Sequence, residues 1–376
     1  MAKGVLHVCD KFGVRGSSIH GVSRLFSWWF PRYDPARFDV SLCGLKDPEP
    51  ATRWLAEQGV PVHHFGRGRF DPRILTDLVA HARRHKARIL HVHGYAAADF
   101  GRLAARMTGA RLVLHEHFAD PKMPAYQAVA DRLLASLTDR AIAVSGSTRD
   151  FLVRERAVPA DRVRLIYNGA PLDEFAPTGP ERGRRIRLEL SLPVDAMVVG
   201  SIGRLNAQKG HRHLLDATPA LLARHPTARV LVVGDGDLKD ELEGQARRLG
   251  VAERVIFAGH RPDVPDVLAA IDVFCISSLY EGTPLALFEA MAAGRAIVST
   301  AVDGCREVLE EGTTGLMVPP ADPAAFARAL DRVLGDAALR EALGRRALEA
   351  SRRFDVGACV EQMEALYDEV LAAGGT

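Results

Sequence analysis

The chain has 376 residues, of which 47% are hydrophobic and 26% are charged, and its formal net charge at pH 7 is +2. This length is too great for one ordinary domain and sufficient for two. The five cysteines are scattered and form no CxxC pair, which argues against a disulfide framework and a structural zinc site. No stretch approaches the roughly 20 apolar residues of a spanning helix, and the apolar run 5–8 is too short for a signal peptide. These observations predict a cytoplasmic protein.

Charge is divided unevenly along the chain. Residues 1–175 hold 26 lysines and arginines against 18 aspartates and glutamates, whereas residues 176–376 hold 23 against 29. A basic first half suits an anionic acceptor, an anionic membrane surface or nucleic acid, although chance clustering gives the same balance. The basic run 81–88 ends a predicted helix, where cations are favoured in any case, and is the candidate for peripheral contact with the inner face of a membrane. No recognition motif accompanies the small excess, which argues against a nucleic-acid partner.

Short apolar runs bounded by glycine, proline or aspartate are predicted as strands, and segments of helical period separate them. In chain order the first series is Val5–Val8, Phe38–Leu45, Val60–Phe65, Arg88–Val92, Arg111–His115, Arg140–Val144 and Val163–Ile166. The second series is Met197–Ile202, Arg229–Val233, Arg254–Phe257, Asp272–Ser277, Ala296–Thr300 and Gly315–Val318. Helices are predicted between them, for example over Pro72–Lys86, His211–His225 and Leu238–Leu249. Strand–helix–strand repetition with continuous apolar strands is typical of a parallel sheet covered on both faces, and here it occurs twice.

A cluster of prolines and glycines within 170–187 interrupts the pattern and predicts a domain boundary. The expected architecture is α/β, with two Rossmann-like, doubly wound parallel-sheet domains over residues 1–175 and 176–355 that face a central cleft. A last helix, about 356–372, is expected to cross back to the first domain. Because ligands bind at the carboxyl ends of parallel strands, each domain is expected to hold one ligand.

The segment 277–294 predicts an anion site. A buried strand ends there, Thr283 is predicted to cap a helix whose first position is Pro284, and Gly294 closes that helix. A helix N-terminus at the carboxyl end of a parallel strand offers free backbone N–H groups to an anion.

Two glutamates flank this helix start. Glu281 lies in the loop, beside the expected phosphates, and Glu289 lies about two turns into the helix, where a carboxylate can bind a ribose diol. The alternative is that they are ordinary surface residues, since glutamates around helix starts are common.

The segment 199–210 is a second strand that ends in a glycine turn, and this turn bears Arg204 and Lys209. A guanidinium and an ammonium on one loop suit a diphosphate whose negative charge grows as a glycosidic bond breaks. The alternative is a pair of solvated cations, but the loop also follows a strand's carboxyl end, which favours the functional interpretation.

The order of these motifs resembles family 4 of the retaining glycosyltransferases, which have the GT-B fold. The resemblance is carried by Arg204-x4-Lys209-Gly210, Val233-Gly234-Asp235-Gly236, Glu281-x7-Glu289 and Thr313-x-Gly315-Leu316, and upstream by Ile166-Tyr167-Asn168-Gly169 followed by Phe175. It covers nearly the whole chain and is strongest over 163–320. It implies transfer of a hexose-type sugar from a nucleoside-diphosphate sugar, UDP favoured over GDP, to a hydroxyl of a sugar, lipid-linked or small-molecule acceptor in glycan, glycolipid or glycoside biosynthesis.

The resemblance also implies roles for particular residues. Arg204 and Lys209 would hold the donor's pyrophosphate, Glu289 its ribose, and Glu281 would lie near the sugar hydroxyls. Donor contacts are further implied for Gly16, Gly203, Gly234, His260, Arg261, Gly282, Thr283, Pro284 and Leu285. Two positions depart from the family's pattern, because Arg15 and Asp303 stand where glycines are expected. Both departures affect the fine geometry expected of the donor-sugar pocket.

Histidines at strand ends are the candidates for the acceptor side. The resemblance implies that His115 lies near the transferred sugar and acts as a catalytic residue. His93 and His117 are further candidates, because neighbouring strand-end histidines can bind sugar hydroxyls or move protons near neutral pH. The aromatic cluster 28–31 is expected to follow the first helix and to pack in the domain core, and a platform for the acceptor is the alternative.

The expected mechanism is a front-face displacement that retains the α configuration, because the motifs place no strong carboxylate nucleophile. The leaving phosphate would accept the acceptor's proton. No metal and no cofactor are expected, because cations and a helix N-terminus neutralise the diphosphate. The alternatives are a nucleotide-sugar 2-epimerase and a non-catalytic sugar-nucleotide-binding scaffold.

Overall fold

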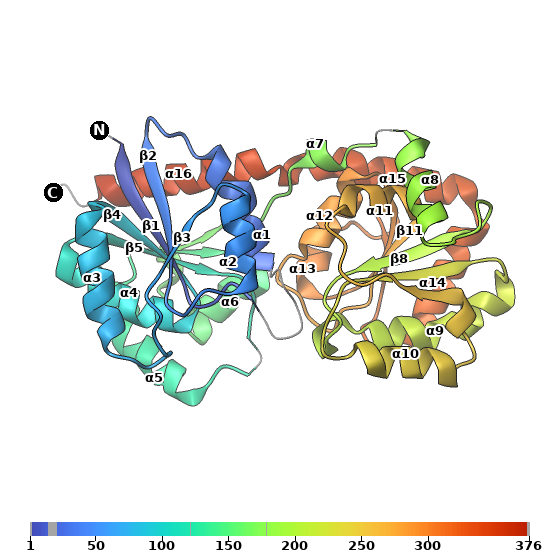
Figure 1. Ribbon diagram of the computed structural model, residues 1–376, viewed down its shortest axis with the longest axis horizontal. Helices are drawn as coiled ribbons and strands as arrows, with labels where there is room; N and C mark the ends of the chain where they lie inside the picture. Colours follow the sequence, from blue (N-terminus) through green and yellow to red (C-terminus); the bar gives the residue numbers. More distant parts are fainter. Residues whose placement is uncertain (1, 14–20, 121, 178, 374–376) are drawn as a thin grey trace. The chain divides into compact units, whose positions relative to one another are not determined.

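The computed structural model describes every residue except 1, 14–20, 121, 178 and 374–376 (Figure 1). The chain forms two compact units. The first unit comprises residues up to Gly169 together with those from Val356 onward, and the second unit comprises Ala170–Asp355. Each unit is a parallel sheet covered by helices, and together they have the GT-B fold.

A seven-stranded parallel sheet forms the centre of the first unit, in the order β3-β2-β1-β4-β5-β6-β7. The order reverses between β1 and β4, which makes the carboxyl ends of these strands the expected ligand-binding edge. The strands are β1 Lys3–Cys9, β2 Phe38–Gly44, β3 Val62–His64, β4 Ala87–His93, β5 Arg111–Glu116, β6 Arg140–Ala143 and β7 Val163–Leu165.

The two faces of this sheet differ in composition because side chains alternate along each strand. One face is aliphatic: residues such as Leu6, Leu90 and Leu112 pack against α3 and α4. The opposite face carries histidines from the central strands beneath α1 and α16, where Phe26 and Tyr367 contact them. The helical elements of the first unit are α1 Gly21–Trp29, η1 Phe30–Arg32, α2 Pro50–Glu57, α3 Arg73–Arg84, α4 Tyr95–Thr108, α5 Ala125–Leu134, η2 Ala135–Leu137, α6 Gly146–Arg154, η3 Ala160–Arg162 and α16 Val356–Ala372.

Helix α16 is held on the first unit by ion pairs. Asp368 pairs with Lys3 at 2.5 Å, and Glu369 pairs with Arg140 at 2.7 Å. Tyr367, which directly precedes these two residues, is fully buried. The C-terminal helix therefore completes the core of the unit in which the chain begins, as its red ribbon beside β1 and β2 shows (Figure 1).

A six-stranded parallel sheet forms the centre of the second unit, in the order β10-β9-β8-β11-β12-β13. Its strands are β8 Val198–Ile202, β9 Arg229–Val233, β10 Val255–Phe257, β11 Val273–Ile276, β12 Ala296–Thr300 and β13 Leu316–Val318. Valines and a cysteine on one face form a core with apolar residues of α9, α10, α14 and α15. The helical elements are α7 Leu172–Phe175, α8 Pro180–Glu189, η4 Ala207–Lys209, α9 His211–Arg224, α10 Lys239–Arg248, η5 Ala252–Arg254, α11 Val264–Ala270, α12 Leu285–Ala292, α13 Asp303–Arg306, α14 Pro323–Gly335, α15 Ala337–Ser351 and η6 Arg352–Phe354.

Each of the thirteen predicted strands is present within the described residues, and the predicted order of strands and helices is confirmed. The placement of the aromatic cluster was wrong in one respect, because Trp28 and Trp29 form the last turn of α1 and do not follow it. Both indoles are buried, as expected of core residues.

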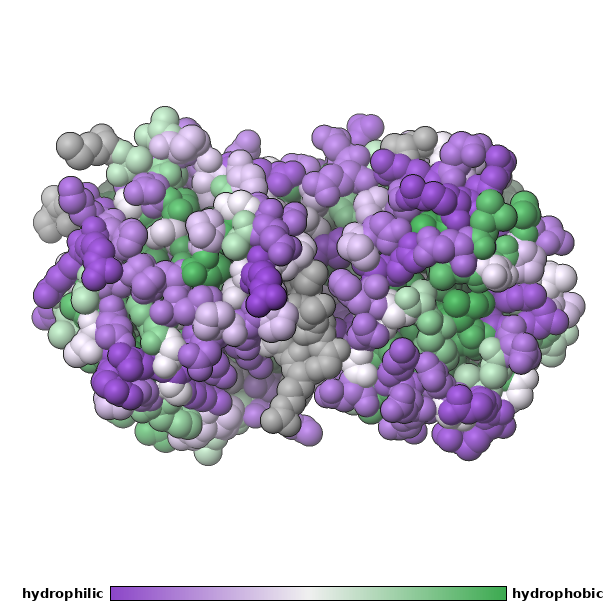
Figure 2. Space-filling view, in the orientation of Figure 1, coloured by the Kyte–Doolittle hydropathy of each residue, from purple (hydrophilic) through white to green (hydrophobic). Residues whose placement is uncertain are grey.

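Among the described helices, none is long and apolar enough to cross a bilayer. Polar and charged residues cover most of the face shown in Figure 2, and apolar residues form separate groups on it.

Candidate functional site

The loop after β8 brings the two predicted cations to the carboxyl edge of the second sheet. Lys209 ends the short helix η4, which Asn206 caps by accepting a hydrogen bond from the Lys209 backbone at 3.2 Å. Gly210 follows with φ +60, and a Cβ there would lie 2.1 Å from the carbonyl oxygen of Ser277. Only glycine fits this position, and its close packing fixes the loop against the end of β11.

Glu281 connects this loop to the segment after β11. Its carboxylate lies 2.7 Å from Lys209 Nζ and accepts a hydrogen bond from Ser278 Oγ at 2.6 Å. Burial lowers the pKa of Arg204, and the charge of Glu281 opposes that shift, so the guanidinium lies within electrostatic reach of the same carboxylate. Arg204, Lys209 and Glu281, which the sequence separates by up to 77 positions, thus form one cluster at the carboxyl ends of two neighbouring strands.

Helix α12 begins beside this cluster, but its start differs from the predicted one. Pro284 occupies the capping position with ψ 121, and its side chain makes no capping hydrogen bond, so the first helical residue is Leu285. Thr283 lies one residue before the capping position, because Pro284 itself is extended and not helical. The N-terminus of α12 still follows the carboxyl end of β11, as an anion site requires.

Two further donor candidates of this segment are buried. Glu289 lies on α12 with 1% of its surface exposed. Gly282 is packed against α13, because a Cβ on Gly304 would lie 1.4 Å from the Gly282 carbonyl oxygen.

The turns after β9 and β10 lie next to each other on the same edge. Gly234 has φ +135, and a Cβ there would lie 2.0 Å from the Gly203 carbonyl oxygen, so two predicted glycines pack directly together. The His260 backbone N–H donates to Asp235 Oδ2 at 3.1 Å, which leaves the exposed imidazole outside that bond.

Arg261 is engaged within the protein. Its guanidinium pairs with Asp263 at 2.6 Å and also with Glu189 of α8, and these two carboxylates raise its pKa. The side chain of Arg261 therefore ties the turn after β10 to α8, and a contact to a nucleobase at this turn would involve backbone atoms. The remaining donor candidate, Gly16, lies outside the described residues, as does Arg15.

A cavity of about 350 Å³ opens at the carboxyl edge of the first sheet. Residues that directly follow β1, β2, β4 and β5 line it, which is the position expected for a ligand site in such a sheet. The lining residues used below are Asp10, Lys11, Lys46, Arg69, His93, Tyr95, Glu116, His117, Asp120 and Lys122. Of these, only the two histidines were predicted as site residues.

The acidic groups of this cavity are already engaged. Asp10 accepts a hydrogen bond from the Ala96 backbone at the start of α4 at 3.0 Å. Glu116 pairs with Arg156 at 2.6 Å, and Asp120 accepts a hydrogen bond from the Tyr95 hydroxyl at 3.0 Å. With its carboxylates paired internally, the cavity presents an excess of positive charge from its lysines and Arg69.

The structure separates the three histidine candidates. His117 and His93 line the cavity, whereas His115 is 1% exposed and lies under the indole of Trp29, with ring centroids 5.3 Å apart. Burial lowers the pKa of His117 to about 3 and holds the pKa of the other two well below 6.5, so all three are neutral at pH 7.

Sequence reasoning missed a buried ion-pair network behind the cavity. Arg156 lies between Glu116 and Asp131, and Asp131 also pairs with Arg102 at 2.5 Å. No local motif marks these residues, because the pairs join positions 25 to 40 apart on different elements. Burial of an arginine would indicate such a network, but the sequence does not show which arginines are buried.

Comparisons with known proteins identify the chain's relatives. A family model described as Glycosyltransferase Family 4 matches residues 31–174, and one described as Glycosyl transferases group 1 matches residues 196–336. The D-inositol 3-phosphate glycosyltransferase of Acidothermus cellulolyticus is 30% identical over 76% of this chain and 67% of that protein. This chain belongs to Glycosyltransferase Family 4. The predicted family is confirmed, and the chain is a glycosyltransferase.

Other relatives of this family 4 glycosyltransferase have names that describe different substrates or reactions. The UDP-Gal:alpha-D-GlcNAc-diphosphoundecaprenol alpha-1,3-galactosyltransferase of Escherichia coli is 27% identical over 85% of this chain and 86% of that protein. HepE from Anabaena, solved in complex with UDP, has a TM-score of 0.85 at 23% identity and covers 97% of this chain and 100% of its own. Sucrose-phosphate synthase from Thermosynechococcus elongatus has a TM-score of 0.81 at 23% identity, over 99% and 100% of the two chains. These two structures share the GT-B fold.

Proposed function

We propose that this glycosyltransferase moves a hexose-type sugar from a nucleoside-diphosphate sugar to an acceptor hydroxyl with retention of the α configuration and without a metal ion. The observation that carries the proposal is the cluster of Arg204, Lys209 and Glu281 at the start of α12. UDP is the favoured nucleotide, because HepE was solved with UDP and the E. coli relative is named for a UDP sugar.

The donor's diphosphate fits the charges of this cluster. Arg204, Lys209 and the N-terminal N–H groups of α12 can contact a diphosphate, and in this proposal they take the place of a metal ion. Glu281 lies 2.7 Å from Lys209 and orients the ammonium while balancing its charge before the donor binds. As the glycosidic bond breaks, negative charge grows on the leaving phosphate, and a preorganised Arg204 stabilises that charge.

The cavity of the first unit is the proposed acceptor site. Its lysines and Arg69 favour an anionic acceptor, and the name of the E. coli relative describes a sugar diphosphate carried by a lipid. His117 lines this cavity and replaces His115 as the proposed contact to the acceptor, because His115 is sealed beneath Trp29. The leaving phosphate remains the proposed acceptor of the hydroxyl proton.

Peripheral membrane contact is proposed through α5 and its neighbour Phe70. Phe70, Val129 and Leu133 are 72%, 56% and 74% exposed, and Phe70 packs edge-on against Tyr126 of α5. Phe70 and Tyr126 lie beside Arg69, which lines the acceptor cavity, so a lipid-linked acceptor could enter the cavity from the bilayer. The basic run 81–88 is less suitable, because it leads into the start of β4, at the opposite edge of the sheet from the cavity.

The proposed donor site is tested with nucleotide sugars and EDTA. UDP-glucose, UDP-N-acetylglucosamine and GDP-mannose are each added to the wild-type protein, and thermal shift and release of free nucleotide are measured. One donor is expected to stabilise the protein and to release nucleotide slowly. Arg204→Ala is expected to lower the release rate by about a hundredfold or more, because it removes a cation that stabilises the leaving group.

Arg212→Ala is the matched control, since Arg212 is an exposed arginine on α9, eight residues further along the chain. Its release rate should equal that of the wild type. Binding without any turnover, with or without acceptor, would favour a scaffold, and conversion of the donor to its 2-epimer without acceptor would identify an epimerase. Activity that EDTA abolishes and Mg²⁺ restores would refute metal independence.

A further inference from the structure

Four buried histidines and one partly buried histidine, His117, gather on one face of the first sheet. His7 lies on β1, His91 and His93 lie on β4, and His115 and His117 lie at the end of β5. The strands are adjacent, with His7 opposite His91 and His93 opposite His115 in register. Since residues two apart on a strand face the same side, this arrangement places all five imidazoles together.

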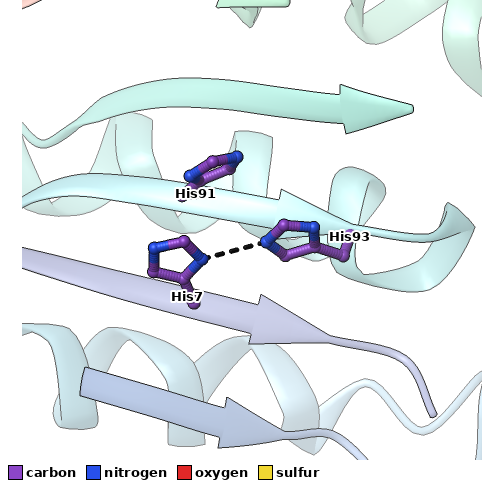
Figure 3. A group of neighbouring side chains, drawn as sticks. All are labelled: His7, His91 and His93. Carbon is purple, nitrogen blue, oxygen red and sulfur yellow. Dashed lines mark hydrogen bonds between the residues drawn. The ribbon is translucent and has the colours of Figure 1, made fainter. Parts of the chain in front are cut away.

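Two rows of imidazoles are linked by nitrogen–nitrogen contacts. In one row, His117 Nε2 lies 3.0 Å from His93 Nδ1, and His93 Nε2 lies 3.0 Å from His7 Nδ1 (Figure 3). In the other row, His115 Nδ1 lies 3.1 Å from His91 Nε2. Figure 3 shows that His91 is beside the His7–His93 pair and does not share their bond.

Two tyrosines join the rows at their inner ends. The hydroxyl of Tyr367 lies 2.6 Å from His91 Nδ1 and 3.1 Å from the hydroxyl of Tyr33. The Tyr33 hydroxyl lies 3.4 Å from His7 Nε2. The seven groups therefore form one continuous path, in the order His115, His91, Tyr367, Tyr33, His7, His93 and His117.

The path can be fully hydrogen-bonded in only two ways. Burial lowers the pKa of each histidine, so each imidazole is neutral and carries one N–H and one acceptor nitrogen, and each phenol carries one O–H. Every group must then donate to the next in the same direction along the path. In one direction all five histidines carry the proton on Nδ1, and in the other all five carry it on Nε2.

The two ends of the path select the direction. Among the described side chains, His115 Nε2 and His117 Nδ1 are buried nitrogens with no hydrogen-bond partner, and they are the two ends. Trp29 stacks on both rings, at 5.3 Å from His115 and 6.3 Å from His117, but His115 is 1% exposed, whereas His117 is partly exposed and lines the acceptor cavity. A buried N–H without an acceptor is rarer than a buried acceptor without a donor. His115 Nε2 should therefore carry no proton and remain an acceptor without a donor.

We propose that this seven-membered chain holds His117 as the Nδ1–H tautomer, so that His117 donates a hydrogen bond to an oxygen of the acceptor and does not act as its base. The identity of the ligand as the acceptor rests on the proposed function, whereas the tautomer of His117 does not depend on it. His7, His93, Tyr33, Tyr367, His91 and His115 are positioning residues, because they act on the ligand only through His117.

Metal binding is the rival explanation of the cluster. One nitrogen from each of His7, His91 and His93 lies within 4.8 Å of the other two, and the same holds for His93, His115 and His117. However, the rings of His91 and His93 are stacked at 25°, and those of His115 and His117 are stacked at 13°. Lone pairs lie in the ring planes, so stacked rings do not direct them to the common point that a tetrahedral ion needs.

The test is nitrogen NMR on the full chain labelled with ¹⁵N-histidine at pH 7.5, with His117 assigned from the signal that is lost in His117→Asn. All five histidines of the path are expected to be neutral and in the Nδ1–H form, with a coupling across the bond between His93 Nδ1 and His117 Nε2. Mixed tautomers, or the Nε2–H form throughout, would overturn the proposal. Stoichiometric bound zinc that His7→Gln abolishes would also overturn it.

A variant tests whether the tautomer is imposed from a distance. His93→Phe keeps a ring but removes the donor to His117 Nε2, so His117 should then populate the Nε2–H form as well. His85→Gln, at an exposed histidine outside the chain, should leave His117 unchanged. If His117 stays entirely in the Nδ1–H form in His93→Phe, the hydrogen-bonded path does not determine the tautomer of His117. A failed donor assay with the expected NMR result would refute the proposed function alone.

Discussion

Arg156 shows how a single buried charge supports the acceptor cavity. Its side chain is fully buried, with Glu116 at 2.6 Å and Asp131 at 2.9 Å. Although burial lowers the pKa of Arg156, the charges of these two carboxylates raise it more, so the guanidinium is charged at any accessible pH. Glu116 lines the cavity, and Arg156 therefore links its wall to the core.

Arg156→Met is expected to destabilise the first unit by about 3–5 kcal/mol, because it leaves Glu116 and Asp131 as buried carboxylates with too few cations. Urea unfolding followed by tryptophan fluorescence measures this loss. Arg154→Met is the control: this arginine is 75% exposed and pairs with Asp150 at 3.5 Å, so its loss should cost less than about 1 kcal/mol. Equal effects of the two substitutions would contradict a role for burial.

At the scale of elements, the central strands β1, β4 and β5 bury four neutral histidines, and a fifth, His117, directly follows β5. Burial lowers the pKa of His7 and His117 to about 3 and holds those of His91, His93 and His115 well below 6.5. In the unfolded chain these groups titrate near 6.5. Below pH 6.5 the unfolded state therefore binds up to five more protons than the folded state at these positions, and the free energy of unfolding falls as pH falls.

Below pH 6.5 each of these histidines contributes a slope of up to about 1.4 kcal/mol per pH unit, or about 7 kcal/mol per unit for five, until the pH reaches its own lowered pKa, which is about 3 for His7 and His117. Because typical stabilities are about 5–15 kcal/mol, the first unit should unfold abruptly between about pH 6 and pH 4. Trp28, Trp29 and Trp54 all lie in the first unit, so tryptophan fluorescence during an acid titration reports on it alone. Unchanged stability to urea at pH 4 would show that the histidines are not held neutral.

The same strands show what a sequence can and cannot reveal. Arg229–Val233 and Ala296–Thr300 are strands with the predicted bounds, because an apolar run between turn-forming residues is a local signal. The hydrogen-bonded chain of histidines is not local: the Tyr367 hydroxyl and His7, 360 positions apart, lie 3.4 Å from each other. Alternation assigns a histidine to a face of its strand, but its partner nitrogen depends on the packing of distant helices.

The candidate donor site was more predictable than the acceptor site, for a related reason. Arg204, Lys209 and Glu281 follow strands whose order was expected, so their meeting at one edge follows from the topology. Which of His115 and His117 reaches the cavity depends on how α1 and the loop after β5 pack, and the pairing of Arg261 with Glu189 depends on where α8 lies. Their roles toward a donor or acceptor stay predictions.

At the scale of the whole molecule, the chain builds two separate cores and returns to the first with its last helix. The first unit is closed by α16, through the pairs of Lys3 with Asp368 and Arg140 with Glu369 and through buried Tyr367. The second unit, Ala170–Asp355, has its own sheet, and the described core cluster of that sheet contains no residue of α16. Chains with separate cores commonly unfold in more than one step.

Truncation after Asp355 is therefore expected to unfold the first unit selectively. Tryptophan fluorescence of the truncated chain should show an unfolded first unit, while circular dichroism should retain a cooperative thermal transition from the second. If the proposed donor site is correct, UDP should raise the melting temperature of that remaining transition. At a hundred times its dissociation constant, UDP adds about 2.7 kcal/mol to the free energy of unfolding.

The full chain should show two thermal transitions, one for each unit. UDP should raise the temperature only of the transition that is not accompanied by a change in tryptophan fluorescence. Loss of all cooperative structure on truncation would mean that the second unit depends on the first for its stability, and that the separate cores do not fold separately.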